Sequence, residues 1–371
     1  MRVIARMNVG GPAIQITNML NGLPTALFEQ RLYFGSCGAG EVEYISEIRN
    51  TAALHRIPGF RRAIGFLSEL SVLTHLIREI KVFQPQIIHT HTAKAGLLGR
   101  LAAMLSGSRA QRIHTFHGHV LYGYFNPVVN MAYTRLERFL ARHTDVIISV
   151  GPEVQADLLK SGIGKREKHR VIFPGIEVGE RLPKSQAQRE LGLGSHKLTV
   201  GFIGRFTHIK RIDRILELAR YCLRDNVDIH FVMAGEGPDY AQFRAEAEQE
   251  RLPMTFLGWR ADVERILSAS DLLILTSDNE GTPIASIQAS LLGVPTLATD
   301  VGSVHDIVIA GETGLLTPPT VGALYSALIK LYENTERLEV LGREAKIFAE
   351  REFSLTRFLE EYSGLYRALA R

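Results

Sequence analysis

Short apolar runs of strand length alternate with helix-length amphipathic stretches along the whole chain, and this alternation constrains the fold more than any other feature. Strands separated by helices are joined by crossover connections, which make them parallel neighbours in a sheet that helices cover on both faces. Each half of the chain holds six such runs, so we predict two doubly wound α/β domains. The runs are residues 3–7, 32–36, 87–90, 112–116, 145–150 and 170–173 in the first half, and 199–203, 228–234, 254–257, 271–276, 295–299 and 314–317 in the second.

The sequence Phe173-Pro-Gly-Ile-Glu-Val-Gly179 interrupts the alternation near mid-chain. We therefore predict one Rossmann-like domain over residues 1–177 and a second over residues 178–353. Two such domains facing one another would form a cleft at the carboxyl ends of both sheets, where ligands of these folds bind. The remaining stretch, 354–371, has helical periodicity with one apolar face. That face carries Phe358, Tyr362, Leu365 and Leu369.

The composition excludes several classes of protein. With 46% hydrophobic and 22% charged residues, the chain has the balance of a soluble globular protein. It contains no run of about 18 apolar residues that would span a membrane. The amino terminus is too polar for a signal peptide. The two cysteines, Cys37 and Cys222, have no zinc-site spacing and fit reduced thiols. We expect a cytoplasmic protein.

The charge is unevenly distributed between the two halves. Residues 1–180 hold 21 Lys and Arg against 13 Asp and Glu, whereas residues 181–371 hold 22 against 26. A basic first half suggests an anionic partner there, either a phospholipid surface at the inner face of the cell membrane or a phosphate-bearing acceptor. Ordinary solvated surface charge is the alternative. We expect no nucleic-acid partner.

The loop and helix from residue 279 to 293 predict an anion site. Between two apolar strand runs, Thr282 suits a helix N-cap, Pro283 the first helical position and Gly293 the helix end. Such a helix start offers free backbone N–H groups beside Gly281, where no side chain obstructs a ligand. Glu280 adds a carboxylate at the edge of this site.

Two earlier loops that follow strands also suit phosphate. Gly10 and Gly11 let the backbone approach a phosphate closely, although a tight turn without a ligand would use them equally well. This loop is not the Gly-x-Gly-x-x-Gly of dinucleotide sites. After residue 203, Arg205 and Lys210 flank a loop and are predicted to clamp a diphosphate, Arg by its fork and Lys as a point charge.

Two further groups of residues follow strands. Gly258 and Trp259 could face a nucleobase, or could form only a capped loop. Five histidines end two adjacent runs in His89-Thr-His91-Thr-Ala-Lys94 and His114-Thr-Phe-His117-Gly-His119, which is more than packing requires. A metal site is disfavoured because no acid lies close by and no Asp-x-Asp pair occurs. Hydrogen bonds to the hydroxyls of a bound sugar are the favoured interpretation.

Together these elements resemble the retaining family 4 glycosyltransferases of the GT-B fold over essentially the whole chain. The specific part is that family's Glu-x7-Glu motif, which here is Glu280-Gly-Thr-Pro-Ile-Ala-Ser-Ile-Gln288. Supporting similarities are Gly-Arg-Phe with Lys210, the segment 171–177 at the domain junction, Gly302-Ser, and Gly311-Glu-Thr-Gly-Leu315. The resemblance implies an enzyme that moves a hexose from a nucleotide diphosphate sugar to a glycan or lipid-linked acceptor in cell-surface polysaccharide assembly.

The resemblance also implies roles for individual residues. Arg205 and Lys210 match the pair that holds the donor diphosphate. Glu280 matches the group that holds the donor hexose and its β-phosphate, together with the backbone of Gly281 to Pro283. His117 matches a histidine near the sugar 6-position, and Gly10-Gly11 the loop against the diphosphate. Residues 1–177 would be the acceptor side, with His91, Lys94 and His119 as candidates, and 178–353 the nucleotide-sugar side. Residues 354–371 would pack back on the first domain.

One position departs from the family motif. The second acid, which holds the ribose hydroxyls in the family, is Gln288 here, and a neutral amide makes weaker hydrogen bonds than a carboxylate. We expect no cofactor and no metal, with Arg205, Lys210 and helix dipoles meeting the charge of the leaving diphosphate. The alternatives are a sugar-nucleotide epimerase and a nucleotide-sugar-binding protein without transferase activity.

Overall fold

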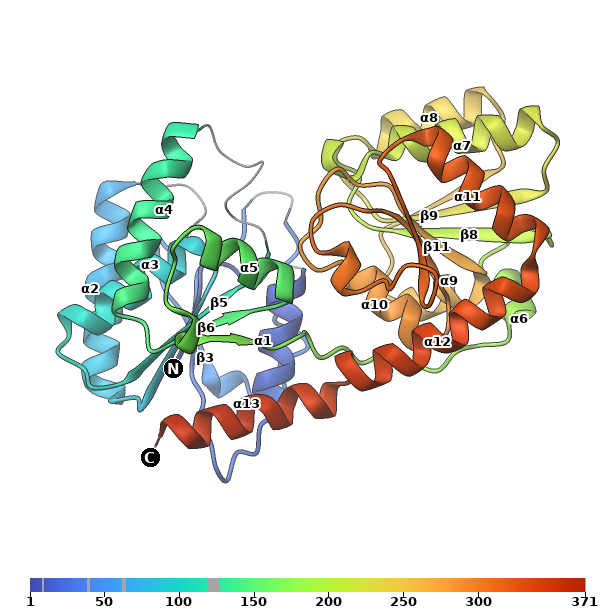
Figure 1. The fold of residues 1–371 in the computed structure, drawn as a ribbon. Coiled ribbons are helices and arrows are strands. Elements are labelled where there is room, and N and C mark those ends of the chain that lie inside the picture. The colour runs from blue at the N-terminus through green and yellow to red at the C-terminus, as the bar shows by residue number, and fades with distance from the viewer. Residues whose placement is uncertain (9, 39–40, 62–64, 119–126, 371) are drawn as a thin grey trace. The chain divides into compact units, whose positions relative to one another are not determined.

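The computed structural model describes residues 1–370 except 9, 39–40, 62–64 and 119–126. The described chain divides into two compact units (Figure 1). Unit 1 comprises Met1–Gly175 together with Leu355–Arg371, and unit 2 comprises Ile176–Ser354. Each unit is an α/β domain built on one parallel sheet.

The sheet of unit 1 has seven parallel strands in the order β3-β2-β1-β4-β5-β6-β7. Chain order runs outward in both directions from the neighbouring strands β1 and β4, which is the doubly wound pattern and puts the topological switch point between them. The strands are β1 (Arg2–Ile4), β2 (Leu32–Phe34), β3 (Leu54–Arg56), β4 (Ile87–His91), β5 (Gln111–Phe116), β6 (Val146–Ser149) and β7 (His169–Val171).

Helices cover both faces of this sheet, because alternate side chains of each strand point to opposite faces. One face packs on α1 and α13, through a cluster that includes Ile4, Ile16 and Tyr362. The other face packs mainly on α2 and α3 through Val3, Val72 and related residues. The helices of unit 1 are α1 (Gly11–Gly22), α2 (Phe66–Phe83), α3 (Ala93–Leu105), α4 (Pro127–Arg142), α5 (Pro152–Lys160) and α13 (Leu355–Leu369).

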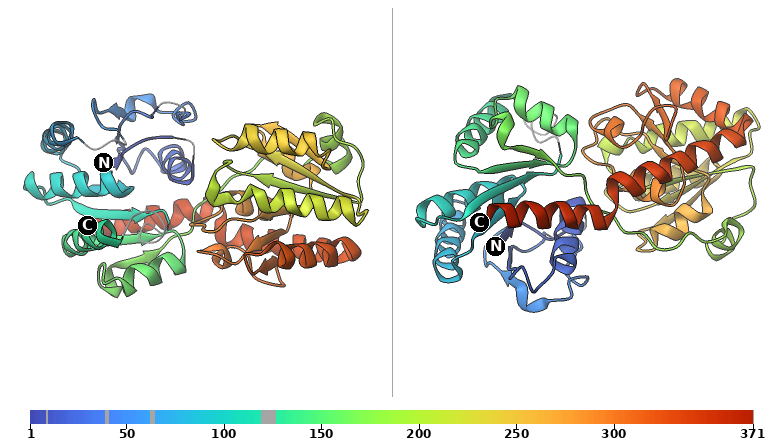
Figure 2. Two further views of the ribbon diagram at one scale, coloured as in Figure 1. Left: turned by 90° about the horizontal axis from the view of Figure 1, so that it is seen from above. Right: turned by 60° about the horizontal axis from the view of Figure 1, so that its bottom comes forward.

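The last helix of the chain, α13, belongs to unit 1 (Figures 1 and 2). Its buried side chains Phe358, Tyr362 and Tyr366 join the cluster formed by α1 and the sheet. A Cβ atom on Gly175 would lie 2.4 Å from Cβ of Phe358, so glycine is needed where the chain leaves unit 1 beneath this helix. The apolar stripe at 358, 362, 365 and 369 is the face that packs.

The sheet of unit 2 has six parallel strands in the order β10-β9-β8-β11-β12-β13, with its switch point between β8 and β11. One face packs on α7, α8, α11 and α12, and the other on α6, α9 and α10. The strands are β8 (Leu198–Ile203), β9 (Ile229–Ala234), β10 (Met254–Gly258), β11 (Leu272–Leu275), β12 (Thr296–Thr299) and β13 (Gly314–Thr317). The helices are α6 (Lys184–Glu190), α7 (Ile212–Arg224), α8 (Tyr240–Gln249), α9 (Val263–Ala269), α10 (Ile284–Leu291), α11 (Val321–Glu333) and α12 (Thr335–Phe353).

Two details of the sequence prediction are wrong. The first sheet has seven strands instead of six, because β3, a three-residue edge strand with partly polar composition, has no apolar run to reveal it. The helix α10 begins at Ile284, one residue later than expected, and Pro283 holds the N-cap position with ψ of 92°, which is not helical. Thr282 therefore precedes the cap, and no side chain caps this helix.

Among the described residues, no helix combines the length and the apolar character needed to cross a bilayer.

Candidate active site

The switch point of unit 2 brings together the two loops that carry the predicted charged residues. The loop after β8 leads to α7, while the loop after the neighbouring strand β11 leads to α10 on the opposite face. Connections that diverge in this way open a crevice at the carboxyl ends of the strands. Lys210 comes from the first loop and Glu280 from the second.

Lys210 and Glu280 bond directly to each other where these two loops meet. Lys210 Nζ lies 2.6 Å from Glu280 Oε1, and the Ser277 hydroxyl donates to the same oxygen at 2.6 Å. Glu280 is only 7% exposed, so its charge is compensated by an ammonium and a hydroxyl rather than by bulk water. The pair forms a preorganised, polar and largely desolvated site.

The two loops are tied to each other by further hydrogen bonds. Thr276 Oγ1 donates to the carbonyl oxygens of Lys210 and Arg211, each at 3.0 Å, and the Asp278 N–H donates to Ile209 O at 2.9 Å. The Asp278 carboxylate also forms ion pairs with Arg211 at 3.0 Å and with Arg214 at 2.7 Å. These contacts fix the backbone from which Lys210 projects.

Gly302, in the loop after β12, packs closely against the main chain of Glu280. Its φ is 54°, a left-handed conformation that glycine adopts without strain, and a Cβ there would lie 2.1 Å from Glu280 O. The N–H of the next residue, Ser303, donates to that same carbonyl at 3.0 Å. Glycine is therefore required at 302 for the main chain of Glu280 to lie where it does.

Arg205 lies near the start of the loop after β8, the loop that also carries Lys210. Its side chain is exposed, and no ion pair engages it within the described part of the chain. The neighbouring Phe206 is fully buried, and its N–H donates to Glu236 O at 3.0 Å. A Cβ on Gly235 would lie 1.9 Å from Gly204 O, so the loops after β8 and β9 pack backbone against backbone.

The residues that follow Glu280 form the entrance to α10. Gly281 and Thr282 are partly exposed and Pro283 is buried. Gln288 is half-buried in the second turn of α10, and its side chain bonds to no described residue. The strand β10 lies at the edge of the same sheet; Gly258 ends it, and the following Trp259 is 52% exposed.

In unit 1 the predicted residues cluster at its own switch point, between β1 and β4. Gly10 is the N-cap of α1, Gly11 is its first residue, and His91 ends β4. His117 follows β5, and its Nε2 lies 2.9 Å from Nδ1 of His91. Burial lowers the pKa of His117 to about 3, so this imidazole is neutral at physiological pH.

The acceptor-side candidates are less open than the sequence suggested. His91 is 0% exposed. The ammonium of Lys94 is held by Glu69 at 2.5 Å and by the carbonyl of Arg61 at 2.6 Å. His119 lies outside the described residues.

The expectation that the histidines exceed what packing requires is wrong for three of them. His89, His91 and His114 are all at most 1% exposed. Strand alternation turns His89 and His91 to the α13 face, where His89 Nδ1 lies 2.6 Å from Tyr366 Oη and His89 Nε2 lies 2.7 Å from Thr115 Oγ1. His114 turns to the other face, with Nδ1 2.8 Å from Thr90 Oγ1.

Sequence reasoning missed Ser277 and Thr276, which hold Glu280 and the Lys210 loop. The available signal was their position, because small hydroxyl residues directly after an apolar strand lie at the carboxyl edge of a parallel sheet. Sequence reasoning also missed Asp278, whose acid could have been paired with the Arg211 and Arg214 that follow β8.

Two family models match the chain in succession. One, described as Glycosyltransferase Family 4, matches residues 9–180, and the other, described as Glycosyl transferases group 1, matches residues 183–348. The two matched regions correspond to the two sheets.

Curated relatives carry related names. A UDP-Gal:alpha-D-GlcNAc-diphosphoundecaprenol alpha-1,3-galactosyltransferase of Escherichia coli is 25% identical over 320 residues, covering 84% of this chain and 82% of the relative. The capsular polysaccharide biosynthesis glycosyltransferase CapM of Staphylococcus aureus is 26% identical over 333 residues, covering 84% of each chain.

Solved structures share the fold. HepE of Anabaena, in complex with UDP and glucose, superposes with a TM-score of 0.80 at 18% identity, covering 99% of this chain and 98% of that one. The sucrose-phosphate synthase of Thermosynechococcus elongatus superposes with a TM-score of 0.81 at 19% identity, covering 99% of this chain and 98% of that one. The predicted fold class, a pair of doubly wound Rossmann-like domains of the GT-B type, is confirmed.

Proposed function

We propose, from the premise that this chain is a glycosyltransferase of the GT-B fold, that it transfers a hexose from a nucleotide diphosphate sugar to a glycan or lipid-linked acceptor in the assembly of a cell-surface polysaccharide. The observation that carries the proposal is the bonded pair of Lys210 and Glu280 at the switch point of unit 2. An ammonium for phosphate and a carboxylate for sugar hydroxyls lie side by side there, as a nucleotide sugar requires.

The donor is assigned to the residues around this pair. Arg205 and Lys210 bind the diphosphate, and the exposed Arg205 has its guanidinium fork available for two phosphate oxygens. Glu280 accepts hydrogen bonds from the hexose hydroxyls, and the backbone of Gly281 to Pro283 lies against the β-phosphate. Gln288 holds the ribose and Trp259 lies at the base.

The reaction is proposed to retain the anomeric configuration. The bond from C1 of the hexose to the β-phosphate oxygen breaks, and the acceptor oxygen bonds to C1 on the same face. The acceptor proton passes to an oxygen of the leaving phosphate, so no protein side chain has to act as a base. Charge that develops on the diphosphate is stabilised by Arg205, Lys210 and backbone N–H groups, which fill the role that a metal ion fills elsewhere.

Contact with an anionic membrane surface is proposed for unit 1 and is assigned to α4. This helix exposes Val129, Met131 and Phe139 at 44%, 49% and 44%, and the exposed Arg135 and Arg142 lie on the same helix. Its single acid, Glu137, is buried against Arg100 at 2.8 Å. Apolar side chains interleaved with arginine, without exposed acid, suit the interface of an anionic bilayer.

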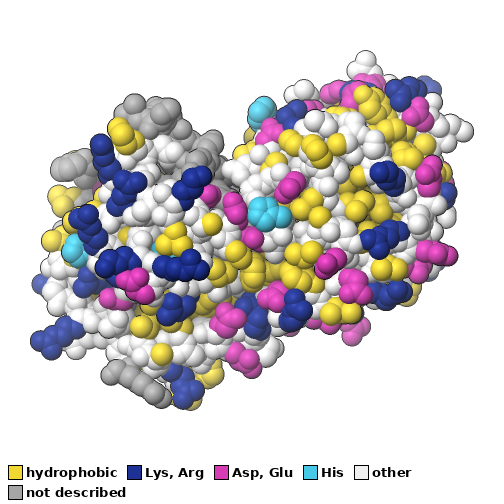
Figure 3. All heavy atoms as spheres, in the orientation of Figure 1, with side chains coloured by type: hydrophobic (Ala, Val, Ile, Leu, Met, Phe, Trp, Pro, Cys, Tyr) yellow, Lys and Arg dark blue, Asp and Glu magenta, His cyan; other side chains and the backbone are white. Residues whose placement is uncertain are grey.

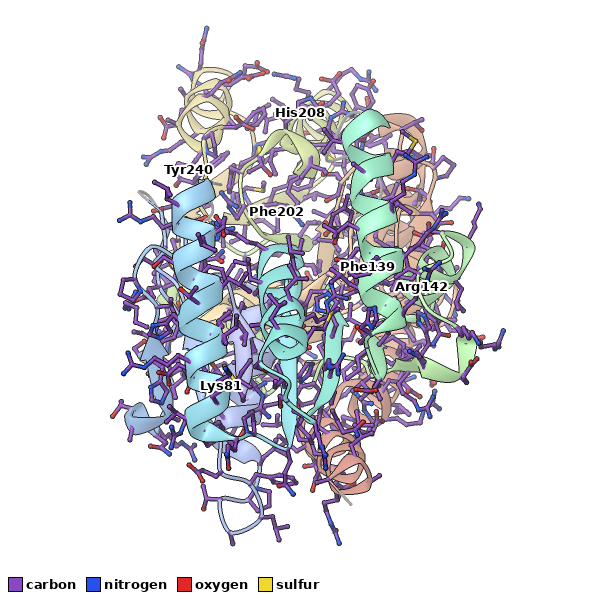
Figure 4. All side chains as sticks on the ribbon, turned by 90° about the vertical axis from the view of Figure 1, so that its left-hand side faces the viewer. Lys81, Phe139, Arg142, Phe202, His208 and Tyr240 are labelled. Atoms are coloured by element: carbon purple, nitrogen blue, oxygen red, sulfur yellow. The ribbon has the colours of Figure 1, made fainter. Side chains whose placement is uncertain are left out.

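The figures display this surface. Figure 3 shows Lys and Arg side chains spread over this unit with hydrophobic side chains among them. Figure 4 looks onto α2, α3 and α4, with Phe139 and Arg142 projecting from α4 and Lys81 carried by α2. The contacts of α3 with α2, and the Arg100–Glu137 pair between α3 and α4, keep the three helices together.

The test is an activity assay with purified protein, a panel of UDP, GDP and ADP sugars, and lipid-diphosphate-linked sugar acceptors. Formation of a glycosylated acceptor that retains the anomeric configuration supports the proposal. Ligand-dependent increases in melting temperature identify the donor independently of turnover. Interconversion of the sugar nucleotide without an acceptor would instead identify an epimerase, and donor binding with neither transfer nor hydrolysis would identify a binding protein.

A further inference from the structure

The residue that follows Lys210 has an unusual backbone conformation. Arg211 lies at φ 51° and ψ 53°, in the left-handed region, where it ends the 3₁₀ turn His208–Lys210 and begins α7 as its N-cap. A residue with a Cβ atom is strained in this region, whereas glycine adopts it freely. Strain of this kind persists only where the surrounding contacts hold it, so the contacts of the Arg211 side chain carry the explanation.

The guanidinium of Arg211 joins two segments of unit 2. Its Nη2 donates to Asp213 Oδ2 at 2.8 Å, within the first turn of α7. Its Nη1 lies 3.0 Å from Asp278 Oδ2, in the loop after β11. The side chain directly after Lys210 therefore ties the start of α7 to the loop that carries Glu280.

Asp278 is the shared partner of two arginines. Arg214 Nη2 lies 2.7 Å from Asp278 Oδ1, and Arg214 Nη1 donates to the Thr276 carbonyl at 2.6 Å. The Arg214 side chain is only 8% exposed, so this contact is largely shielded from water. Burial alone would raise the pKa of Asp278, but the hydrogen bonds from Arg211 and Arg214 outweigh it and lower the pKa below its usual value. The Asp278 carboxylate is therefore ionised at neutral pH.

The main chains of the same two loops are also bonded to each other. The Asp278 N–H donates to Ile209 O at 2.9 Å, and Thr276 Oγ1 donates to the carbonyl oxygens of Lys210 and Arg211, each at 3.0 Å. Lys210 and Glu280 thus project from backbone segments that are joined by hydrogen bonds and by an ion-pair network.

Lys210 needs such support because its own side chain supplies little. An ammonium is a point charge on a flexible four-carbon stem. The 2.6 Å bond to Glu280 directs it, but a diphosphate would compete with Glu280 for the same three N–H donors. When that competition occurs, the position of the Lys210 backbone is what keeps the ammonium beside the carboxylate.

We infer that Arg211 and Asp278 are positioning residues, and that the network of Arg211, Asp278 and Arg214 locks the loop after β8 to the loop after β11 and so holds Lys210 beside Glu280. Neither positioning residue would touch the donor. The strain at 211 is retained because arginine, unlike glycine, supplies the guanidinium that reaches Asp278. The benefit for a diphosphate rests on the proposed function, whereas the coupling of the two loops does not.

The decisive measurement is hydrogen–deuterium exchange of the full-length protein, followed by mass spectrometry of peptides that cover residues 207–213 and 276–282. In Asp278→Asn and in Arg211→Gly these amides should exchange about threefold to tenfold faster than in wild type, because each change removes charge-assisted bonds between the loops. The double variant should exchange no faster than Asp278→Asn, since both changes break one network. Unchanged exchange in the single variants would overturn the inference.

A second comparison tests the strained backbone. Arg211→Gly and Arg211→Ala both lack the guanidinium, so the difference between them reports the backbone conformation. The Gly variant should melt about 1 to 4 °C higher, because relief of left-handed strain exceeds the extra freedom that glycine has in the unfolded chain. An Ala variant that melts at or above the Gly variant would overturn the part assigned to strain at Arg211.

The transferase assay separates positioning from substrate contact. Arg211→Gly should lower kcat/KM about threefold to tenfold in the wild-type background and should have no further effect in Lys210→Ala, because Arg211 acts through Lys210. An equal loss in both backgrounds would contradict the inference. Should the wild-type protein transfer no sugar, the proposed function fails, and the exchange measurement, which needs neither ligand nor turnover, still decides whether the lock exists.

The matched control is Arg220→Gln, on the same helix as the start of the lock. The Arg220 side chain is 31% exposed, close to the 28% of Arg211, and it forms ion pairs with Glu217, Glu246 and Glu250. These acids lie on α7, on α8 and just after α8, away from the two loops. Exchange of the loop peptides and the kinetics should match wild type in this variant, and faster exchange there would contradict a role specific to Arg211.

Discussion

Lys210 and Glu280, 70 residues apart in the sequence, meet with Nζ 2.6 Å from Oε1, and Ser277 Oγ completes the contact on the same carboxylate oxygen. An ammonium has three N–H donors. Lys210 can therefore keep one bond to Glu280 while directing another at a phosphate oxygen. The carboxylate orients the cation, and the cation offsets the cost of burying a carboxylate that is only 7% exposed.

Replacing Arg205 with Ala should lower kcat/KM by a factor equivalent to about 2 to 4 kcal/mol, because it would remove the proposed charge-assisted bond to the leaving diphosphate. The melting temperature without ligand should be unchanged, since the Arg205 side chain is exposed and engages no ion pair among the described residues. Arg343→Ala, at an exposed arginine of α12, is the control. Transfer within about threefold of wild type would rule out the clamp assignment.

Glu280→Gln should reduce kcat on the order of a hundredfold while changing the donor dissociation constant far less, because in the proposed mechanism the carboxylate touches the reacting sugar. Steady-state kinetics and isothermal titration with the donor measure the two effects. Glu339→Gln, at an exposed acid of α12, should be silent. A donor affinity that falls in step with kcat would make Glu280 a ground-state ligand only.

Position 288 tests the departure from the family motif. If Gln288 holds the ribose, Gln288→Glu should keep activity and tighten donor binding, because charge-assisted hydrogen bonds are roughly twice as strong as neutral ones. Gln288→Ala should weaken donor binding. Dissociation constants from titration calorimetry check both, and unchanged affinity in the Ala variant would remove 288 from the site.

Transfer should continue in the presence of EDTA, since in the proposed mechanism Arg205 and Lys210 supply the positive charge that a divalent ion would otherwise supply. Initial rates with and without chelator measure this. Loss of activity on chelation, with recovery on addition of a divalent cation, would show that the mechanism needs a metal.

Binding to vesicles that contain phosphatidylglycerol should weaken about fivefold for each of Arg135→Gln and Arg142→Gln, because a basic residue near an anionic surface contributes about 1 kcal/mol. Phe139→Ser should weaken binding at any ionic strength, whereas the arginine effects should fade as salt rises. Co-sedimentation measures all three, with Arg343→Gln as control. Equal binding to neutral vesicles would contradict the electrostatic part of the assignment.

The fold class followed from the sequence because parallel strands buried on both faces leave uninterrupted apolar runs. That Lys210 and Glu280 lie near each other also follows from the strand pattern, because loops after neighbouring parallel strands share one edge of the sheet. The edge strand β3 could not be recognised, because its residues Leu54–Arg56 are paired on one side only and lack an apolar run.

The histidines of unit 1 show where sequence reasoning fails. His89 belongs to the group of five histidines near strand ends that, from the sequence alone, exceeds what packing requires. Its partner Tyr366 lies 277 residues away in the last helix. Helical periodicity identified the packing face of that helix, but periodicity does not identify which buried polar group a tyrosine on this face will meet.

The return of α13 to unit 1 has a consequence for the order in which the chain folds during synthesis. Residues 176–354, which make up unit 2, are contiguous and are synthesised before Phe358, Tyr362 and Tyr366. The face of α1 and of the first sheet that these side chains cover stays open to water until the last helix has left the ribosome. The unit that starts at the amino terminus is thus the second to complete its core, the reverse of the usual order in which domains fold as they are made.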